Sequence, residues 1–447
     1  MMKQNPVQNR HKRFWWLLGL LVLLIMTRYA LQIDLPRVVF LVVIGLIALL
    51  GDRDEILALC TCFIPMHESI DFFYALAITL VIYIFKYYRQ LRFQTNIALI
   101  FLVILWELLH CFRQSFSPVD FLSGIVPFIV LAVMMASETD ELDYPFLVRA
   151  FAWATLGISV VLFVRVLHFS DFNFLLAIAG LQRIGLDVQS NIQGAAITGG
   201  LVHPNSLGII AVLSSTGLMQ LRSKKVSKKS DMFLMCTILV FAALGTSRTY
   251  LACLAMMILL LIFAERGGMA KKLRLLGVLC VAVAVAVAAL ALFFPDTFAY
   301  FVSRFTVSDI TTGRDSLLVL YHHFVVSEPK VMFLGIGLQD FGNRLTEYYR
   351  VASIIPHNSV QEIIVAWGIP GLVLFTAVMI SMSQSAFERN RHMALINWIP
   401  LIIILFKGLA GQIITSAYTM LAMSFAYLSL CADLAPEAQQ KELLPQR

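Results

Sequence analysis

The chain has 447 residues, of which 60% are hydrophobic and only 14% are charged, and its mean hydropathy is +0.83. Soluble domains carry about 25% charged residues, so this composition excludes a water-soluble globular protein. Ordinary contents of Gly and Pro, with 7 scattered Cys, also exclude collagen-like, disordered and disulfide-stapled chains. Unbroken apolar runs at 14–25 and 97–106 are unlike the alternation of β-barrel strands. The remaining class is an all-α polytopic membrane protein.

Apolar segments predict the membrane-spanning helices. In chain order they lie at 14–31, 36–50, 55–64, 70–85, 95–112, 119–136, 146–169, 195–220, 231–246, 249–264, 275–294, 359–384, 394–408 and 412–431. The first lacks a signal-peptide cleavage site and another apolar run follows at once, so we expect an uncleaved span. Because 36–50, 55–64 and 394–408 are shorter than the ~20 residues that cross a bilayer, we expect them to be tilted, broken or re-entrant, and about 12 to 14 spans in all.

Basic clusters between the spans predict the orientation. If the spans alternate, the clusters on one side are those at 10–13, 86–92, 222–229, 266–274 and 389–391. Enrichment of Lys and Arg marks the cytoplasmic side, so both termini are expected in the cytoplasm and the number of spans is even. The formal net charge of +7 therefore reflects topology, and no nucleic-acid partner is expected.

Two polar stretches, 168–194 and 295–358, fall on the opposite, external side. The second predicts an amphipathic helix capped by Thr312 with Asp315, because apolar residues repeat there at helical spacing: Leu317, Leu318, Tyr321, Phe324 and Val325. The expected organisation is N-terminal spans at 1–145, a transmembrane core at 146–294, an external, partly helical loop at 295–358, C-terminal spans at 359–431 and a cytoplasmic tail at 432–447.

One polar pair on the external side precedes a helix. His357 and Asn358 are followed after nine residues by a Gly-x-x-Gly motif at 368–371. Ser359 and Glu362 fit a capping box and the two glycines fit close helix packing, which explains the segment structurally except for His357 and Asn358. A helix N-terminus also suits an anionic ligand, so a binding role for this pair is equally compatible with the sequence.

Three arginine-containing motifs lie on the same side. Arg248, between two hydroxyl residues in a short turn, fits either a snorkelling side chain or a phosphate fork. Arg314 fits either a solvated ion pair with Asp315 or an anion site. Arg183 precedes the motif His203-Pro204-Asn205, which by itself fits a turn and a helix N-cap.

Several charged or titratable residues lie within the spans or near their ends. Those inside should face protein or a cavity because they are costly in lipid: Glu107, His110, Arg149, Arg165 and Lys407. Arg28, Arg37 and Lys407 lie near span ends and fit snorkelling. Only Glu107 is a carboxylate deep in a span, which argues against an ion-coupled transporter. The Cys and His spacings fit no zinc site, so no metal is expected.

In series these motifs resemble the O-antigen ligase and O-antigen polymerase superfamily of bacterial membrane glycosyltransferases. The resemblance covers residues 146–431, and its most specific part is His357-Asn358 with the glycines that follow; Gly335-Ile336-Gly337 also takes part. It implies a metal-independent, inverting transfer without a cofactor, at the external face of the bacterial inner membrane, from a glycan on undecaprenyl diphosphate. Flippase and chain-length regulator proteins are the implied partners. The external segment 295–358 is short for a ligase, which favours a polymerase of capsule, exopolysaccharide or O-antigen.

The family match implies the residue roles. Arg248 and Arg314 would bind the diphosphate with Arg183 as a third candidate, and arginine suits this because it is always protonated and bidentate. His357 would act as the base or bind diphosphate. The implied substrate-binding residues are Arg183, His203, Asn205 and Asn358.

Three alternatives stay open. A ligase would transfer the lipid-linked glycan to lipid A core. A transporter of lipid-linked sugar would need charged residues on several spans and no dependence on His357. A peptidoglycan glycosyltransferase of the elongation type would need an essential external carboxylate, for which the candidates are Asp309, Asp315 and Asp340.

Overall fold

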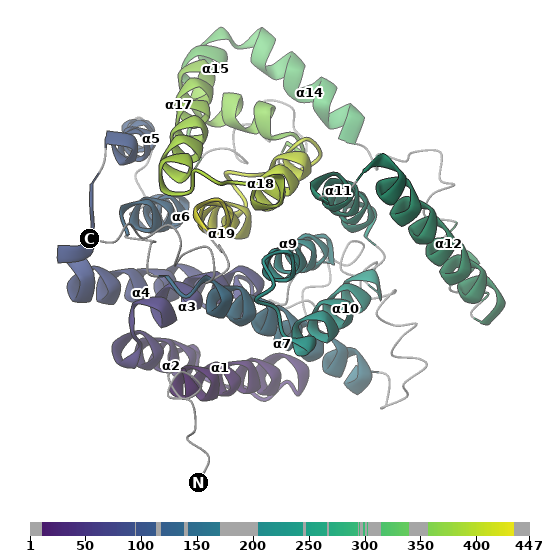
Figure 1. The fold of residues 1–447 in the computed structure, drawn as a ribbon. Coiled ribbons are helices and arrows are strands. Elements are labelled where there is room, and N and C mark those ends of the chain that lie inside the picture. Colours follow the sequence, from purple (N-terminus) through teal and green to yellow (C-terminus); the bar gives the residue numbers. More distant parts are fainter. Residues whose placement is uncertain are drawn as a thin grey trace, which may run out of the picture.

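A computed structural model of the chain describes most of the predicted spans. The described residues are 11–93, 95–112, 118–137, 142–169, 204–244, 247–265, 268–293, 295, 298–299, 302, 314–338 and 356–432. Their regular structure is helical, and their one β-type contact is an isolated bridge between Leu91 and Ser137. The predicted all-α class is confirmed (Figure 1).

The helices follow the predicted apolar runs closely. In chain order they are α1 (Lys12–Ile25), the π-helical η2 (Met26–Ala30), α2 (Arg37–Leu50), α3 (Arg53–Met66), α4 (Phe72–Tyr87), the 3₁₀ turn η3 (Tyr88–Gln90), α5 (Thr95–Cys111), α6 (Pro118–Ala136), α7 (Tyr144–Phe169), α9 (Pro204–Ser223), α10 (Lys229–Leu244), α11 (Arg248–Ala264), α12 (Met269–Phe293), α14 (Arg314–Ser327), α15 (Pro329–Leu334), α17 (Ser359–Arg389), α18 (Leu395–Gly408) and α19 (Ala417–Cys431).

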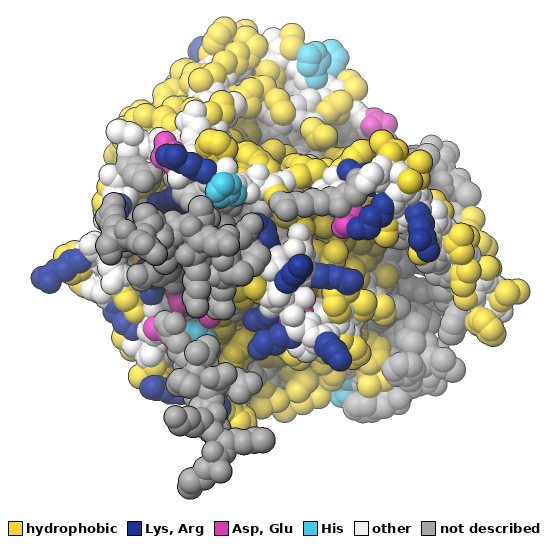
Figure 2. All heavy atoms as spheres, viewed as in Figure 1, with side chains coloured by type: hydrophobic (Ala, Val, Ile, Leu, Met, Phe, Trp, Pro, Cys, Tyr) yellow, Lys and Arg dark blue, Asp and Glu magenta, His cyan; other side chains and the backbone are white. Residues whose placement is uncertain are grey.

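Helix length and surface character are those of a membrane protein. Within the described ranges, four helical stretches are long and apolar enough to span a bilayer: Lys12–Ala30, Phe72–Gln90, Tyr144–His168 and Ser359–Arg389. The short predicted spans correspond to α2, α3 and α18, each of 14 residues, or about 21 Å at 1.5 Å per residue. Figure 2 shows hydrophobic side chains over much of the outline of the viewed face, with Lys and Arg gathered within it. Peripheral α12 also exposes apolar side chains, including Val278, Val281 and Val285.

The core is built around α3, α7 and α19. Almost every residue of α3 and α19 is buried, including Asp54 and Glu55 in the first turn of α3. Helix α3 packs along α7 and also against α19, so the N-terminal spans and the C-terminal spans share one core. The motif-bearing helices are held against this core through the packing of α9 on α7 and of α11 on α18.

Two predicted boundaries near the C-terminus are wrong. The last span was expected to begin at 412, but α19 begins at Ala417, because the backbone N–H groups of Ile413 and Thr415 are bonded to the Glu362 side chain instead of to a helix. The span predicted at 359–384 is also longer than expected, because α17 continues to Arg389 and is kinked at Gly368.

Candidate functional site

Each of the four polar motifs opens a helix in the structure. Helix α9 begins at Pro204, α11 at Arg248, α14 at Arg314, and α17 at Ser359, immediately after Asn358. The first N–H groups of a helix lack partners within it, so each of these starts can receive an acceptor oxygen. Four predicted residues lie outside the described part of the chain: Arg183, His203, Asp309 and Asp340. Thr312 does too, and of Arg314 only the backbone is described.

The α9 and α11 motifs are joined by a side-chain hydrogen bond. The hydroxyl of Ser247, the buried N-cap of α11, donates to Oδ1 of Asn205 at 2.6 Å and accepts from the backbone N–H of Tyr250 at 3.2 Å. A Cβ added at Gly208 would lie 2.5 Å from Tyr250 Cβ, so the first turns of the two helices are in close contact. This arrangement places half-buried Arg248, in the first turn of α11, beside the start of α9.

The start of α17 is capped differently from the sequence prediction. Asn358 is the N-cap, and its Oδ1 accepts from the N–H groups of Val360 (3.0 Å) and Gln361 (3.2 Å). The expected capping box of Ser359 and Glu362 is wrong, because Ser359 donates to the Gly411 carbonyl at 3.1 Å. Asn358 therefore fixes the helix start, and half-buried His357 stands immediately before it.

Glu362 organises a loop that connects α18 and α19. Its fully buried carboxylate accepts from the N–H groups of Ile413 (2.7 Å) and Thr415 (2.8 Å), and from the Thr415 hydroxyl. Asn358 Nδ2 adds a bond to the Leu409 carbonyl at 3.3 Å. The loop between α18 and α19 is thus tied to the first turn of α17.

Lys407 holds the same loop from the other side. Its side chain is 7% exposed, and Nζ donates to the Gln412 carbonyl and to the Thr419 hydroxyl (3.0 Å) while lying over the Tyr418 ring. The expectation that Lys407 snorkels is therefore wrong, and the expectation that it faces protein is confirmed. From the sequence, Glu362 was expected in a capping box and Lys407 was not connected with it. Their opposite charges, near the ends of consecutive apolar segments, were the signal that both could hold the same loop.

The predicted amphipathic helix is α14, which packs beside the start of α17. Tyr321 and Phe324 are buried as expected, while Leu318 is exposed. The Gln361 side chain donates to the Leu318 carbonyl at 2.9 Å, and α14 contacts both α15 and α17. Figure 1 shows α14 following the rim of the molecule toward α11. The helix that begins at Arg314 is thereby anchored to the helix that follows His357.

The glycine motifs form a tight backbone crossing. Gly335 and Gly368 have φ of 75° and 70°, which favour glycine. Ile336 N–H donates to the Val365 carbonyl at 2.9 Å, and Gly337 N–H to the Ala366 carbonyl at 2.7 Å. These bonds replace helical ones at the kink of α17. The glycines of the family-like signature thus have a structural role in this chain.

Two polar residues of α5 lock this crossing. Glu107, 2% exposed, accepts from the Trp367 indole N–H at 2.7 Å and from the Leu338 N–H at 3.0 Å. The Nε2 atom of His110 lies 2.6 Å from the Leu334 carbonyl. The expectation that both residues face protein is confirmed. Glu107, the carboxylate predicted to lie deep in a span, holds the crossing together by hydrogen bonds.

Among the residues that the structure describes, one group of potential metal ligands lies elsewhere. Ligand atoms of His11, Asp52 and Glu55 are within 4.8 Å of one another, at the starts of α1 and α3. Asp52 and Glu55 already form a reciprocal capping box at 3.0 and 3.1 Å, and Glu55 also contacts His11 Nδ1 at 3.0 Å. Their bonding is that of a helix cap joined to the start of α1.

Comparison of the chain with models of known protein families and with curated proteins gives no match. The family resemblance consequently rests on the sequence motifs alone.

Proposed function

We propose that the protein is a membrane glycosyltransferase that polymerises undecaprenyl-diphosphate-linked oligosaccharide repeat units of a surface polysaccharide. The observation that supports this best is the Ser247–Asn205 hydrogen bond, which joins two motifs that are 42 residues apart in sequence. The capped start of α17 at Asn358 supplies the third motif. The proposal places the reaction at the external face of a bacterial inner membrane, with both termini in the cytoplasm.

The chemistry is a single inverting displacement at the anomeric carbon. An acceptor sugar hydroxyl attacks C1 of the donor glycan, the new C1–O glycosidic bond forms, and the bond from C1 to the diphosphate oxygen breaks. His357 takes the proton from the attacking hydroxyl. Arg248 and Arg314 stabilise the negative charge on the departing lipid diphosphate, since guanidinium groups bind phosphate oxygens bidentately. The activated donor supplies the energy, so no nucleotide is needed at the site.

A transporter fits the buried charges less well. Glu107, Glu362 and Lys407 are each bonded to backbone groups of neighbouring segments. Such bonds hold segments together, whereas a coupling site needs groups that change partners during transport. A ligase shares the proposed site chemistry and differs in its acceptor.

A one-substrate assay tests the proposal. Purified protein is incubated with a lipid-diphosphate-linked oligosaccharide, and the products are separated on a gel. A ladder of longer glycans is expected, because donor and acceptor are then the same molecule. If transfer occurs only after lipid A core is added, the protein is a ligase and not a polymerase. If no new glycosidic bond forms with either acceptor, the protein is not a glycosyltransferase of this kind.

A further inference from the structure

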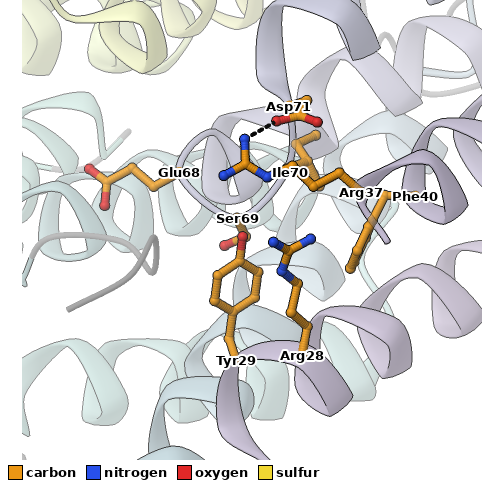
Figure 3. A pocket seen from close by; sticks show the side chains of 8 residues that line it. All are labelled: Arg28, Tyr29, Arg37, Phe40, Glu68, Ser69, Ile70 and Asp71. Carbon is orange, nitrogen blue, oxygen red and sulfur yellow. Dashed lines mark hydrogen bonds and ion pairs between the residues drawn. The ribbon is translucent and has the colours of Figure 1, made fainter. Parts of the chain in front are cut away.

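A cavity of about 250 Å³ lies among the first four spans, and none of the motif residues lines it. It is bounded by the π-helical end of the first helix, the start of α2 and the turn from α3 to α4. Figure 3 shows eight side chains around it: Arg28, Tyr29, Arg37, Phe40, Glu68, Ser69, Ile70 and Asp71. Two arginines in one small cavity are unexpected for residues that merely snorkel.

The two arginines differ in how their charge is balanced. Arg37 is paired with the Asp71 carboxylate at 3.0 Å. The other carboxylate of the cavity, Glu68, lies 3.3 Å from Nε2 of His67. Arg28 has no ion pair within the described part of the chain. Its Nη1 donates to the Leu35 carbonyl at 2.9 Å, and its guanidinium lies 5.5 Å from the Tyr29 ring centroid and 5.8 Å from that of Phe40. The stacking orients a cation whose remaining N–H donors are left for a ligand.

A buried hydroxyl lines the same cavity. Ser69 is 1% exposed, and its Oγ has no hydrogen-bond partner among the described residues. Most buried hydroxyls in folded proteins are bonded, so an unbonded one next to a cation calls for a ligand acceptor. A guanidinium and a hydroxyl together match the oxygens of a phosphate group.

Exposed residues that are close in sequence to the lining residues indicate what carries the phosphate. Leu31, Ile33 and Val38 lie beside them in sequence, before and after the start of α2, and all three are exposed. Exposed apolar side chains in a membrane protein contact acyl chains. A ligand held here by its phosphate would therefore have its apolar part against these residues, as a lipid does and free phosphate does not.

The cavity is near the end of the bundle where α19 begins. The His67 ring centroid lies 4.8 Å from that of Tyr418, and Tyr418 in turn underlies Lys407. The turn after α3 is thus connected by direct contacts to the loop that Asn358 and Glu362 hold.

We propose that this cavity binds the phosphate of a membrane lipid headgroup through Arg28 and Ser69, with the lipid chains against Leu31, Ile33 and Val38. This site is separate from the proposed transfer site and does not depend on glycosyl transfer.

Binding of three ligands to the delipidated full-length protein tests the proposal by native mass spectrometry or thermal shift. Phosphatidylglycerol should bind and raise the melting temperature. Diacylglycerol, which has the same chains without phosphate, and inorganic phosphate, which has no chains, should do so much more weakly. Equal binding of diacylglycerol would show that the phosphate is not recognised, and equal binding of inorganic phosphate would show that the site is not a lipid site. Either result overturns the proposal.

Two variants and one control assign the binding to this cavity. Arg28→Gln should weaken phosphatidylglycerol binding about tenfold, the loss expected for one charge-assisted hydrogen bond. Arg89→Gln is the matched control because Arg89 also lies 5.5 Å from a tyrosine ring, that of Tyr88, but outside the cavity. Equal losses in the two variants, or none in Arg28→Gln, would refute the assignment.

Ser69→Ala separates binding from structure. Since the hydroxyl is buried without a partner, its removal should leave the melting temperature of the lipid-free protein unchanged or higher, while phosphatidylglycerol binding weakens. A lower melting temperature with unchanged lipid affinity would mean that Ser69 serves only packing, and would contradict the proposal.

Discussion

The crossing at Gly335 and Gly368 and the helix starts at Ser247 and Asn358 both use polar residues among apolar helices, but in different ways. At the crossing, the Glu107 carboxylate and the nearby backbone N–H groups bond to one another inside the protein. At the helix starts, one side chain caps the helix while Arg248 or His357 beside it is half-buried. One sequence signature therefore combines glycines with a structural role and residues that stand beside capped helix starts.

Substitution of the arginine at the α11 start should have the largest effect. Arg248→Ala is expected to lower product formation by about 100- to 1000-fold, because one charge-stabilising donor to the leaving diphosphate is lost. The gel assay with purified protein measures this, with insertion and melting temperature checked in parallel. Arg222→Ala, in the last turn of α9, is the control. If the two variants are equally active, Arg248 has no part in the reaction.

The kink in α17 should be sensitive to any side chain. Gly368→Ala is expected to lower the free energy of unfolding by about 3 kcal/mol, because φ is positive there and strained for alanine. The added Cβ would also lie 2.7 Å from the carbonyl carbon of Phe333. Thermal unfolding in detergent provides the measurement. Gly277→Ala, in an open position of α12, should be neutral or stabilising; similar destabilisation in both would argue against a required kink.

Removal of the carboxylate in α5 should destabilise the crossing. Glu107→Ala leaves the Trp367 indole and the Leu338 N–H without their buried acceptor, at a cost of about 2 kcal/mol. Glu388→Ala, at an exposed position of α17, is the matched control. Activity per folded molecule should stay near wild type, measured below the melting temperature of the variant. A stable but inactive Glu107→Ala protein would instead indicate a catalytic carboxylate.

The smallest effect on stability is expected at the α11 N-cap. Ser247→Ala should cost about 1 kcal/mol, the usual contribution of a cap, and activity should fall further because the bond to Asn205 is lost. Ser247→Thr keeps the hydroxyl and should restore most of the activity. Failure of threonine to restore it, with normal stability, would show that the hydroxyl bond does not position the site.

Local signals in the sequence were sufficient for most of the fold. The apolar runs predicted helices that the structure contains, and the stripe with Tyr321 and Phe324 predicted α14. Long-range contacts were not predictable in the same way. Glu362 has the spacing of a capping box, yet it bonds to Ile413, 51 residues away. The folded arrangement of α17, α18 and α19 determines whether Glu362 bonds to the start of its own helix or to the loop before α19.

The site was partly predictable for the same reason. The expected position of Asn358 just before a helix start is confirmed, whereas Asn205 lies within the first turn of α9, which begins at Pro204. The bond between Asn205 and Ser247 depends on the packing of α9 against α11, which no local pattern encodes. Similarly, Arg28 and Arg37 read as separate span-end residues, and only the folded turn between α3 and α4 brings them to one cavity.

The most direct test of the transferase follows both ends of the reaction in a single turnover. A donor labelled in its lipid diphosphate and in its sugar is incubated with the wild type and with His357→Ala. The wild type is expected to release one lipid diphosphate for each new glycosidic bond. The His357→Ala protein is expected to be folded but to leave the donor intact. Intact donor with the wild type, or equal turnover in both proteins, would contradict the proposed reaction.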